Sequence, residues 1–345
     1  MNIKEVAARA KVSTATISRT INQSESVDPK TAQRVWRAIR ELNYYPSSQA
    51  RALVSGRSRM LGLIISDISN PFFPELVKSF DDAAIENGYE VVVSNTDYKS
   101  DRMSLCVRRM IERNVDGVAI MTSEIDSHLV EELSRRRLPM VFLDLGKLKP
   151  FVSNILVDYS KGIEEAVRHL VGLGHQKIGF ISGPLNLKSA HTRRAAFLHG
   201  LQSCGLSRRQ YMEVEGNHRV DGGDVAMRGL LAYPDRPTAV LTSNDLTAIG
   251  ALRAITTAGL SAPHDISLIG FDDIELSQYT QPPLTTVRLS REELGRKAFD
   301  ALFRSVEGLT KSGQEIGVST TLVLRQSTGP APTAKASRRA KARTR

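Results

Sequence analysis

The stretch Ile3-Lys-Glu-Val-Ala-Ala-Arg-Ala-Lys-Val-Ser-Thr-Ala-Thr-Ile-Ser-Arg-Thr-Ile-Asn22 predicts two short helices joined by a tight turn. Apolar residues recur at three- and four-residue steps in its first half, which puts one apolar stripe on the first helix. Ser13 can cap a second helix over residues 14–21, because its hydroxyl accepts a backbone hydrogen bond. Two short helices, the second presenting small polar side chains and an arginine, are typical of a helix-turn-helix.

A third helix is predicted to follow. Asp28 and Pro29 suit its N-cap and first position, since the carboxylate accepts backbone donors and proline needs none there. The apolar side of this helix is expected to comprise Ala32, Val35, Trp36, Ile39 and Leu42. Residues 1–46 are therefore predicted to form a small helix-turn-helix headpiece.

The charge of this region indicates a DNA-binding headpiece. Residues 1–59 hold 11 Lys and Arg against 4 Asp and Glu, a net charge of +7. In the major groove Thr14 can hydrogen-bond, Ala15 can contact a thymine methyl, and Arg19 can donate two bonds to guanine. The residues predicted to read DNA here are Thr14, Ala15, Thr16, Ser18, Arg19 and Asn22. The alternative is a basic three-helix surface without a nucleic-acid role.

Residues 47–59 are predicted to form a hinge helix and linker. Pro46 breaks the preceding helix, Ser47 can cap a new one, and residues 48–54 give room for two turns. A helix this short is unstable alone in water, so we expect it to form only against DNA and its twin from a second subunit. Leu53 would then wedge between base pairs in the minor groove. The hinge residues predicted to bind DNA are Ala50, Arg51, Leu53 and Val54, although composition alone also fits a flexible linker.

The remaining charge is distributed unevenly. The chain has 345 residues and a net charge of +10, and residues 330–345 carry +6, which leaves −3 for residues 60–329. Basic charge at the two ends indicates that only the ends meet a polyanion. Residues 330–345 are predicted to be a disordered basic tail, which either adds nonspecific DNA affinity or has no partner.

Cysteine usage and hydropathy indicate the compartment. Cys106 and Cys204 lie far apart in predicted helices, without the spacing of a zinc site or a disulfide framework. No apolar run resembles a signal peptide or reaches the length of a membrane span. These features predict a cytoplasmic protein with no metal, no cofactor and no membrane partner.

From Met60 onward, apolar strands alternate with amphipathic helices, which predicts an α/β body with parallel sheets covered on both faces. The first series is expected to have strands at residues 61–68, 90–94, 116–121 and 140–144 and helices at 73–87, 101–113 and 127–137. The second is expected to have strands at 155–158, 177–182, 212–214, 238–243 and 266–271 and helices at 161–173, 192–204, 222–232 and 246–258. A crossing at 285–289, a helix at 292–306 and a strand at 320–324 complete the prediction. Residues 60–329 thus predict two doubly wound parallel-sheet lobes of periplasmic-binding-protein type with a ligand cleft between them.

Four motifs match one known family: Ile3-Lys4-Glu5-Val6-Ala7, Val12-Ser13-Thr14-Ala15-Thr16-Ile17-Ser18-Arg19, Tyr45-Pro46 and Ala50-Arg51-Ala52-Leu53. With them the chain, up to about Gly329, resembles the lac-repressor (LacI/GalR) family of bacterial transcription regulators. The resemblance implies a homodimer that reads a near-palindromic operator, with Leu53 of each hinge at a central minor-groove step. Lys11 departs from the glycine or asparagine frequent at its position. Val54 departs from the lysine of a purine-responsive member.

The cleft is expected to be lined by loops that follow the carboxyl ends of strands. Phe72 or Phe73, after the first strand, could stack on a flat ligand face. The resemblance implies a ligand-binding arginine at Arg193, and it puts His218 where a purine-responsive member has phenylalanine. Since an arginine beside carboxylates suits paired sugar hydroxyls and imidazole makes the cleft more polar, we favour a sugar effector. The predicted effector-binding residues are Phe72, Phe73, Arg193, His218, Asn244 and Asp272.

Each of these residues has a structural alternative. Phe72 and Phe73 can be buried in the helix that they open, after a turn at Asn70-Pro71. Arg193 can be solvated beside Arg194, and Asp272 can be a helix-start charge. Asp144 either lines the cleft or ends its strand. His175 is expected to be a helix-end residue without chemistry.

The sequence lacks the motifs of the enzyme classes that its lobes could serve. A nucleophile elbow, a phosphate-binding loop, a His-Glu-x-x-His zinc motif and a dinucleotide fingerprint after the first strand are all missing, so we predict that it is not an enzyme. A transporter-associated binding protein shares the lobes but needs an export signal and no headpiece. The predicted function is a ligand-responsive transcriptional repressor.

The predicted partners are double-stranded operator DNA, a sugar or sugar derivative, and a second copy of the chain. A purine or another metabolite acting as corepressor is the alternative effector. Ligand binding is expected to change how the lobes sit against each other and thereby whether the paired hinges fold on DNA.

Overall fold

The computed structural model describes residues 2–21, 26–44, 57–122, 131, 133, 135–144 and 148–332. Its contacts divide the chain into two compact units, Met1–Arg59 and Met60–Arg345. Most of the predicted hinge, most of the helix expected at residues 127–137 and the tail beyond residue 332 lie outside the described residues.

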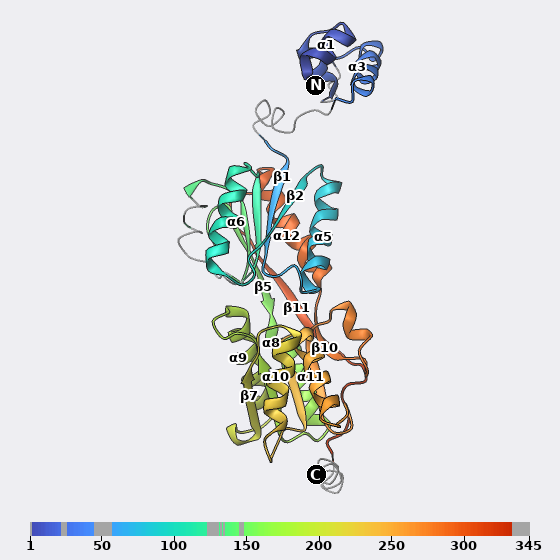
Figure 1. Ribbon diagram of the computed structural model, residues 1–345. Helices are drawn as coiled ribbons and strands as arrows, with labels where there is room; N and C mark the ends of the chain where they lie inside the picture. Colours follow the sequence, from blue (N-terminus) through green and yellow to red (C-terminus); the bar gives the residue numbers. More distant parts are fainter. Residues whose placement is uncertain are drawn as a thin grey trace. The chain divides into compact units, whose positions relative to one another are not determined.

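The first unit contains the three predicted helices, drawn in blue in Figure 1: α1 (Ile3–Ala10), α2 (Thr14–Ile21) and α3 (Pro29–Glu41). Both predicted caps are present. Ser13 Oγ accepts a hydrogen bond from the Thr16 amide at 3.1 Å, and Asp28 Oδ2 accepts one from the Thr31 amide at 3.0 Å. Lys11 ends α1 with a left-handed φ of 56°. Glycine or asparagine suits this position better, because lysine meets a steric penalty there.

A small apolar core holds the three helices together. Its buried members are Val6, Ala7, Ala10, Ile17, Val35, Ala38 and Ile39. The prediction that Trp36 lies on the apolar side of α3 is wrong, since this residue is 39% exposed. The buried side of α3 consists instead of Val35, Ala38 and Ile39.

The second unit is built on strands in the hydrogen-bonded order β2-β1-β3-β4-β5-β11-β10-β9-β8-β6-β7. The strands are β1 (Met60–Ile65), β2 (Glu90–Asn95), β3 (Gly117–Met121), β4 (Met140–Leu143), β5 (Val152–Asp158), β6 (Ile178–Ser182), β7 (Tyr211–Glu215), β8 (Ala239–Thr242), β9 (Ser267–Asp272), β10 (Thr285–Leu289) and β11 (Glu315–Val323). The helices are α5 (Phe72–Glu86), α6 (Ser100–Glu112), α8 (Tyr159–Gly172), α9 (Lys188–Ser203), α10 (Val220–Leu231), α11 (Asp245–Thr257) and α12 (Arg291–Val306), with short 3-10 turns at Arg208–Gln210 and Glu275–Gln278. Neighbouring strands are parallel except β10 and β11, which are antiparallel.

Helices cover both faces of each half of this sheet. In the first lobe, β1 to β4 with α5, α6 and α12, Leu63 packs in the core under α5 and α12, whereas Ile64 packs in the cluster under α6. In the second lobe, β6 to β9 with α8 to α11, Phe180 packs with α8 and α9, whereas Ile181 packs with α10 and α11. Alternate residues of one strand point to opposite faces, so the buried runs mark strands covered on both sides. This confirms the two doubly wound lobes.

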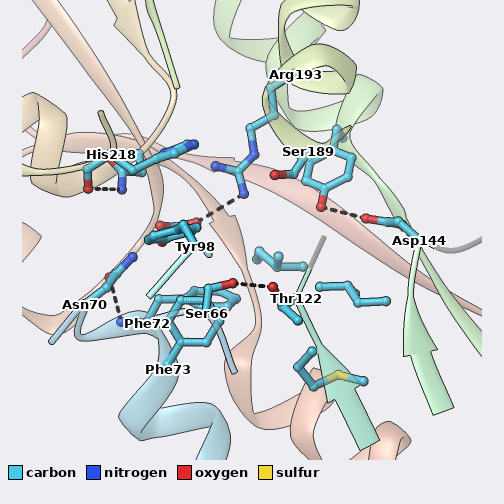
Figure 2. Close-up of a pocket in the computed structure, with 16 residues that line it drawn as sticks. Ser66, Asn70, Phe72, Phe73, Tyr98, Thr122, Asp144, Ser189, Arg193 and His218 are labelled. Atoms are coloured by element: carbon cyan, nitrogen blue, oxygen red, sulfur yellow. Dashed lines mark hydrogen bonds and ion pairs between the residues drawn. The ribbon is translucent and has the colours of Figure 1, made fainter. Parts of the chain in front are cut away.

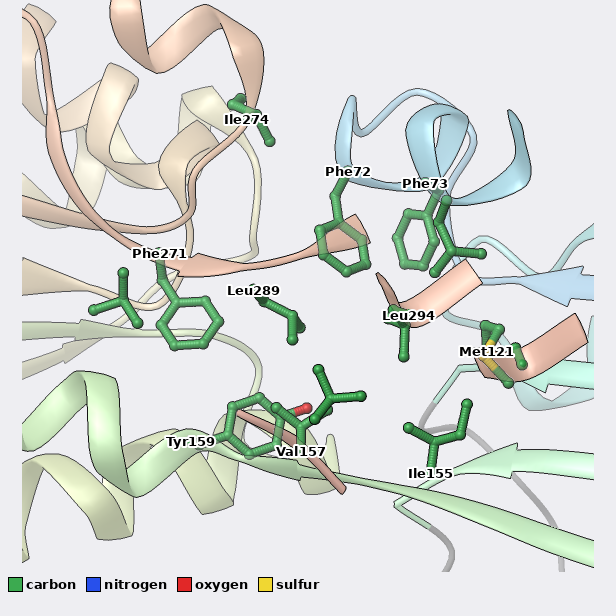
Figure 3. Packing of buried hydrophobic residues seen from close by; sticks show 14 of the residues in the cluster. Phe72, Phe73, Met121, Ile155, Val157, Tyr159, Phe271, Ile274, Leu289 and Leu294 are labelled. Atoms are coloured by element: carbon green, nitrogen blue, oxygen red, sulfur yellow. The ribbon is translucent and has the colours of Figure 1, made fainter. Parts of the chain in front are cut away.

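Three strands join the lobes at the middle of the unit (Figure 1). β5 leads from the first lobe to α8, and β10 leads back to α12, which packs on α5. β11 pairs in parallel with β5 through its first five residues and antiparallel with β10 through its last four. One apolar cluster continues through this crossing, where Val157 and Leu289 connect the Phe72 side to the Phe271 side (Figure 3).

Three elements begin at least three residues earlier than predicted, and one of them is β5, which begins at Val152 rather than at residue 155. β11 begins at Glu315 rather than at residue 320, because its exposed first half and Gly317 hide the strand pattern. α9 begins at Lys188 rather than at residue 192, and its N-cap Leu187 makes no side-chain cap bond that would mark the start. None of the helices in the described part of the chain has both the length and the apolar character of a membrane span.

Gly162 tests the packing of α8 on the crossing. A Cβ at this position would overlap Val287 Cγ1 and lie 2.7 Å from Thr320 Oγ1. We expect Gly162→Ala to destabilise the protein by about 1–3 kcal/mol through overpacking, although alanine favours helices. The matched control is Gly172→Ala in the same helix, where an added Cβ would meet no described atom within 4 Å apart from the backbone of its own helix. It should stabilise the protein by up to about 1 kcal/mol. Thermal midpoints that rise for both variants would contradict the packing described.

Candidate functional site

A pocket lies between the two lobes, with an empty volume of about 570 Å³ that is partly open to solvent. The six predicted effector-binding residues all line it: Phe72, Phe73, Arg193, His218, Asn244 and Asp272. Figure 2 shows that Arg193 points from α9 into the space between His218, Tyr98 and Asp144. The pocket therefore collects polar side chains from strand ends that are far apart in sequence.

Arg193 is the central cation of the pocket and is 9% exposed. Its Nη1 donates to the Ser243 carbonyl, and its Nη2 lies 3.8 Å from Asp272 Oδ1. The guanidinium carbon lies 4.1 Å from the ring centroid of Phe271 and 5.2 Å from that of Tyr159. The Nε atom is buried and has no hydrogen-bond partner among the described residues. An unused buried N–H costs about 1–3 kcal/mol, so a ligand acceptor is favoured beside it.

Asp272 is the acceptor facing this arginine. It ends β9 with a φ of 107°, and it is 4% exposed. Burial raises its pKa to about 6, against the opposing effect of the Arg193 and Arg291 charges. The Asp245 carboxyl nearby is also buried, and its pKa is raised by burial and by the charge of Asp272. Asp245 is used internally, since it accepts hydrogen bonds from Thr286 Oγ1 and the Ile274 amide at 2.6 and 2.8 Å.

His218 and Asn244 form one wall of the pocket. The His218 ring stacks on Tyr98 of the opposite lobe, with centroids 6.2 Å apart and planes within 15°. Burial, followed by the charge of Arg193, lowers the pKa of His218 to about 3, so the ring is neutral. Asn244 Nδ2 donates to the His218 carbonyl at 2.9 Å, and its Oδ1 caps α11 by accepting from the Thr247 amide at 2.9 Å. Asn244 thus fixes the position of His218.

Phe72 and Phe73 belong to the core as well as to the pocket. They are 6% and 7% exposed, and their rings meet edge to face with centroids 5.2 Å apart. Asn70 Oδ1 accepts a hydrogen bond from the Phe72 amide at 3.1 Å, so the turn before α5 holds both rings. Phe72 and Phe73 are therefore buried at the start of α5, as the structural alternative predicts, and they also line the pocket.

The opposite wall contains Asp144. Its Oδ2 accepts a hydrogen bond from the Tyr159 hydroxyl at 2.8 Å, and its Oδ1 accepts one from the Val157 amide at 3.0 Å. Burial raises the pKa of Asp144. Lys188 of α9 donates to the Asp144 carbonyl, which joins the two lobes on this side.

Ten lining residues were not among the predicted six. They are Ser66, Asn70, Tyr98, Met121, Thr122, Leu143, Asp144, Tyr159, Ser189 and Leu289. Tyr98, Thr122 and Tyr159 follow the ends of β2, β3 and β5. The rule that ligands bind beside the carboxyl ends of parallel strands, which pointed to Asp272, therefore also predicts these three residues. Ser189 precedes Arg193 by one helical turn on α9, and the late predicted start of that helix hid it.

The predicted DNA-reading residues are described on α2 only. Thr14, Ala15 and Arg19 are exposed, whereas Thr16 and Ser18 are half-buried. The Thr16 hydroxyl lies 3.0 Å from Ser13 Oγ, so it takes part in the cap of the helix. Asn22, Ala50, Arg51, Leu53 and Val54 lie outside the described residues.

Comparisons with known proteins agree with both units. Residues 2–47 match the family "Bacterial regulatory proteins, lacI family", and residues 167–328 match a periplasmic binding protein-like domain. The chain is 34% identical to the HTH-type transcriptional repressor PurR of Edwardsiella ictaluri, over 96% of this chain and 97% of that protein. It is 36% identical to the ribose operon repressor of Escherichia coli, over 94% of this chain and 99% of that protein. The crystal structure of the lac repressor dimer bound to operator and the anti-inducer ONPF superposes with a TM-score of 0.85 at 31% identity, covering 95% of this chain and 99% of that one.

The chain belongs to the LacI family of bacterial regulatory proteins. It is a ligand-responsive DNA-binding transcriptional repressor of this family, and it is not an enzyme.

His218 should make the fold sensitive to acid. Its pKa is about 3 in the folded protein, below the ordinary 6.5. The unfolded chain therefore binds more protons, and stability falls as the pH drops through 6.5, by about 1.4 kcal/mol per unit at lower pH. Asparagine tolerates the left-handed backbone of this position, which has a φ of 62°. Between pH 7 and pH 5, we expect the thermal midpoint of His218→Asn to fall by about 4 °C less than the midpoint of the wild type.

The exposed His264 supplies the control. The variant His264→Asn should keep the wild-type dependence of the midpoint on pH. Equal losses in His218→Asn and the wild type would show that His218 is not held neutral by burial.

Proposed function

We propose that the effector is an uncharged sugar, bound between the lobes by Arg193 and Asp272, and that its binding changes operator affinity. The observation that carries this proposal is the pairing of a buried arginine with a buried carboxylate 3.8 Å from its Nη2, where the arginine Nε has no partner among the described residues. Neighbouring hydroxyls of a sugar can each donate to a carboxylate and accept from a guanidinium. One hydroxyl placed between these groups could accept a hydrogen bond from Arg193 Nε, while its neighbour donates to Asp272.

The charge of the lining argues against a phosphorylated effector. Among the described residues that line the pocket, Arg193 is the one permanent cation, and Asp144 and Asp272 are carboxyls. A phosphate would add negative charge beside two acids in a poorly hydrated site, where like charges repel strongly. A neutral polyol avoids this repulsion.

The arrangement of the rings favours a sugar over a purine. Tyr98 and His218 stack on each other, and Phe72 and Phe73 meet at 88°, so neither pair presents two free parallel faces to a flat base. The tilted Tyr159 and Phe271 rings already lie against the Arg193 guanidinium. A sugar needs one apolar face and several polar partners, which this lining provides.

Operator recognition is proposed to divide between two grooves. Thr14, Ala15, Thr16, Ser18, Arg19 and Asn22 would read base edges in the major groove. Ala50, Arg51, Leu53 and Val54 of the hinge would bind the minor groove, with Leu53 as the wedge. An effector that binds one arrangement of the lobes better than the other shifts the protein toward that arrangement and so changes the hinge. Since its target is DNA in the cell, we place the protein in the cytoplasm.

Substitution of Arg193 tests the effector site. A thermal-shift panel on the full-length protein should include neutral monosaccharides, sugar phosphates and purines, because a specific ligand raises the midpoint by mass action. We expect a neutral sugar to raise the wild-type midpoint and to have no effect on Arg193→Gln. The control is Arg194→Gln, whose arginine pairs with Glu213 outside the pocket. This control should respond like the wild type.

Two results of the panel would contradict the proposal. A shift produced by purines but not by sugars would replace the sugar with a purine corepressor. An unchanged sugar response in Arg193→Gln would place the binding site elsewhere.

Substitutions of Arg19 and Leu53 test the operator interface. The preferred duplex is first selected from a random pool with the wild-type protein. We expect Arg19→Ala to cost about 1–3 kcal/mol in binding and to relax the preference at one base pair. Leu53→Ala should weaken binding without changing base preference in the major groove, because it acts through the bent minor groove.

The control for this test is Leu309→Ala, an exposed leucine of the second unit. It should bind the selected duplex like the wild type in titrations at one fixed salt concentration. Wild-type affinity of Leu53→Ala would refute the wedge.

A further inference from the structure

Two loops meet at the edge of the cleft, one from each lobe. Asp97 and Tyr98 follow β2 in the first lobe, and His218 and Arg219 precede α10 in the second. The Tyr98 and His218 rings stack there, as described above (Figure 2). Beside the rings, Arg219 Nη2 lies 2.9 Å from Asp97 Oδ1 and 3.4 Å from Asp67 Oδ2. A ring contact and a charge contact thus bridge the lobes at adjacent residues.

The acceptors of this arginine are held in place by their own lobe. The Asp67 side chain is 8% exposed, and its Oδ1 accepts hydrogen bonds from the Ser69 amide and hydroxyl at 2.9 and 2.6 Å. Asp97 also pairs with Lys99 at 3.1 Å. Fixed acceptors reduce the loss of side-chain freedom when the arginine docks, which strengthens a charge contact relative to a flexible surface pair.

The backbone at this contact is constrained as well. Asp97, Tyr98 and His218 have φ values of 53°, 56° and 62°. Such left-handed conformations are unfavourable for non-glycine residues, and most of all for a bulky one such as tyrosine. This conformation directs the Tyr98 and His218 rings toward each other and places the neighbouring Asp97 and Arg219 charges within reach of each other.

We infer that Arg219 is a positioning residue for effector binding, which holds the lobes closed over the pocket by joining Asp67 and Asp97. The inference rests on the proposed function, in which the effector binds between the lobes. If only the closed arrangement binds it, the observed affinity falls by the fraction of molecules that are open. Loss of Arg219 therefore weakens binding although its side chain is not part of the pocket lining.

Arg228 provides a matched control on the same helix. It pairs with Asp224 of α10 at 2.9 Å, inside one lobe, and its side chain is 53% exposed, close to the 50% of Arg219. Removal of either arginine takes away one half-exposed positive charge from α10 and its N-cap. Only the removal of Arg219 breaks a contact between the lobes.

The first experiment needs no effector. Deuterium uptake is measured on full-length Arg219→Ala, Arg228→Ala and wild-type protein without added sugar, in peptides that cover residues 63–73, 95–103 and 214–224. We expect uptake in Arg219→Ala to be about threefold faster in these peptides, because the cleft opens more often. Arg228→Ala should match the wild type. Equal uptake in the two variants would overturn the inference, whatever binds in the pocket.

The second experiment measures binding by calorimetry. The probe is the neutral monosaccharide among D-ribose, D-glucose and D-galactose that gives the largest thermal shift. We expect Arg219→Ala to bind it about threefold more weakly at low salt, and Arg219→Lys to recover part of the loss. Raising the salt concentration should lower the sugar affinity of the wild type toward that of Arg219→Ala and leave the affinity of the variant unchanged, because salt screens a half-exposed charge contact.

The results separate the two claims. Faster uptake in Arg219→Ala with no binding of any of the three sugars would retain the closing contact and reject the sugar. Sugar binding with equal affinity and equal salt dependence in Arg219→Ala and wild type would reject the role of Arg219 and retain the sugar.

Discussion

The pairing of β11 with both β5 and β10 is the constraint on which the sensor unit depends. Backbone hydrogen bonds tie this one strand to the first lobe along one half and to the second lobe along the other. The lobes cannot separate without breaking a ladder, so any relative motion must be a twist or bend of the three connecting strands. The pocket lies beside this crossing, so rotations there would change the distance between Tyr98 and His218, which face each other across the cleft.

Three ionisable groups are buried in and beside the pocket. Arg193, Asp272 and Asp245 lie among aromatic and β-branched residues, where an unpaired charge is costly. For Asp245 this cost is offset by the hydrogen bonds that it accepts from Thr286 Oγ1 and the Ile274 amide. For Arg193 and Asp272 the cost is offset only in part, since they are 3.8 Å apart and Arg193 Nε has no partner in the described part of the chain. Arg193 and Asp272 line the pocket, where a ligand can reach them, whereas the hydrogen bonds of Asp245 stabilise the fold.

The parts of the fold that could be predicted from sequence are those with a local signal. Ser13 and Asp28 mark helix starts because their caps depend on nearby backbone. The strands β1, β3 and β9 are evident because both of their faces are buried. The first half of β11 was missed since its side chains alternate toward solvent, and Trp36 was misplaced because the rotation of α3 depends on its neighbours.

The same distinction between local and tertiary signals applies to the residues of the pocket. Asp272 could be found because it ends a recognisable strand, and Arg193 because the family resemblance marks its position. The stacking of Tyr98 on His218 could not be found, since it depends on how two loops meet across the cleft. The internal use of Asn244 was also hidden, because its partners His218 and Thr247 come together only in the fold.

The raised pKa of Asp272 has a consequence for the physiology of the repressor. With a value of about 6, roughly one molecule in ten is protonated at neutral pH. Acidification of the cell interior would increase that share and so remove the acceptor that we propose for the effector. Under the proposed function, hydrogen ions and effector would then compete at Asp272, and more effector would be needed to fill the pocket at lower pH.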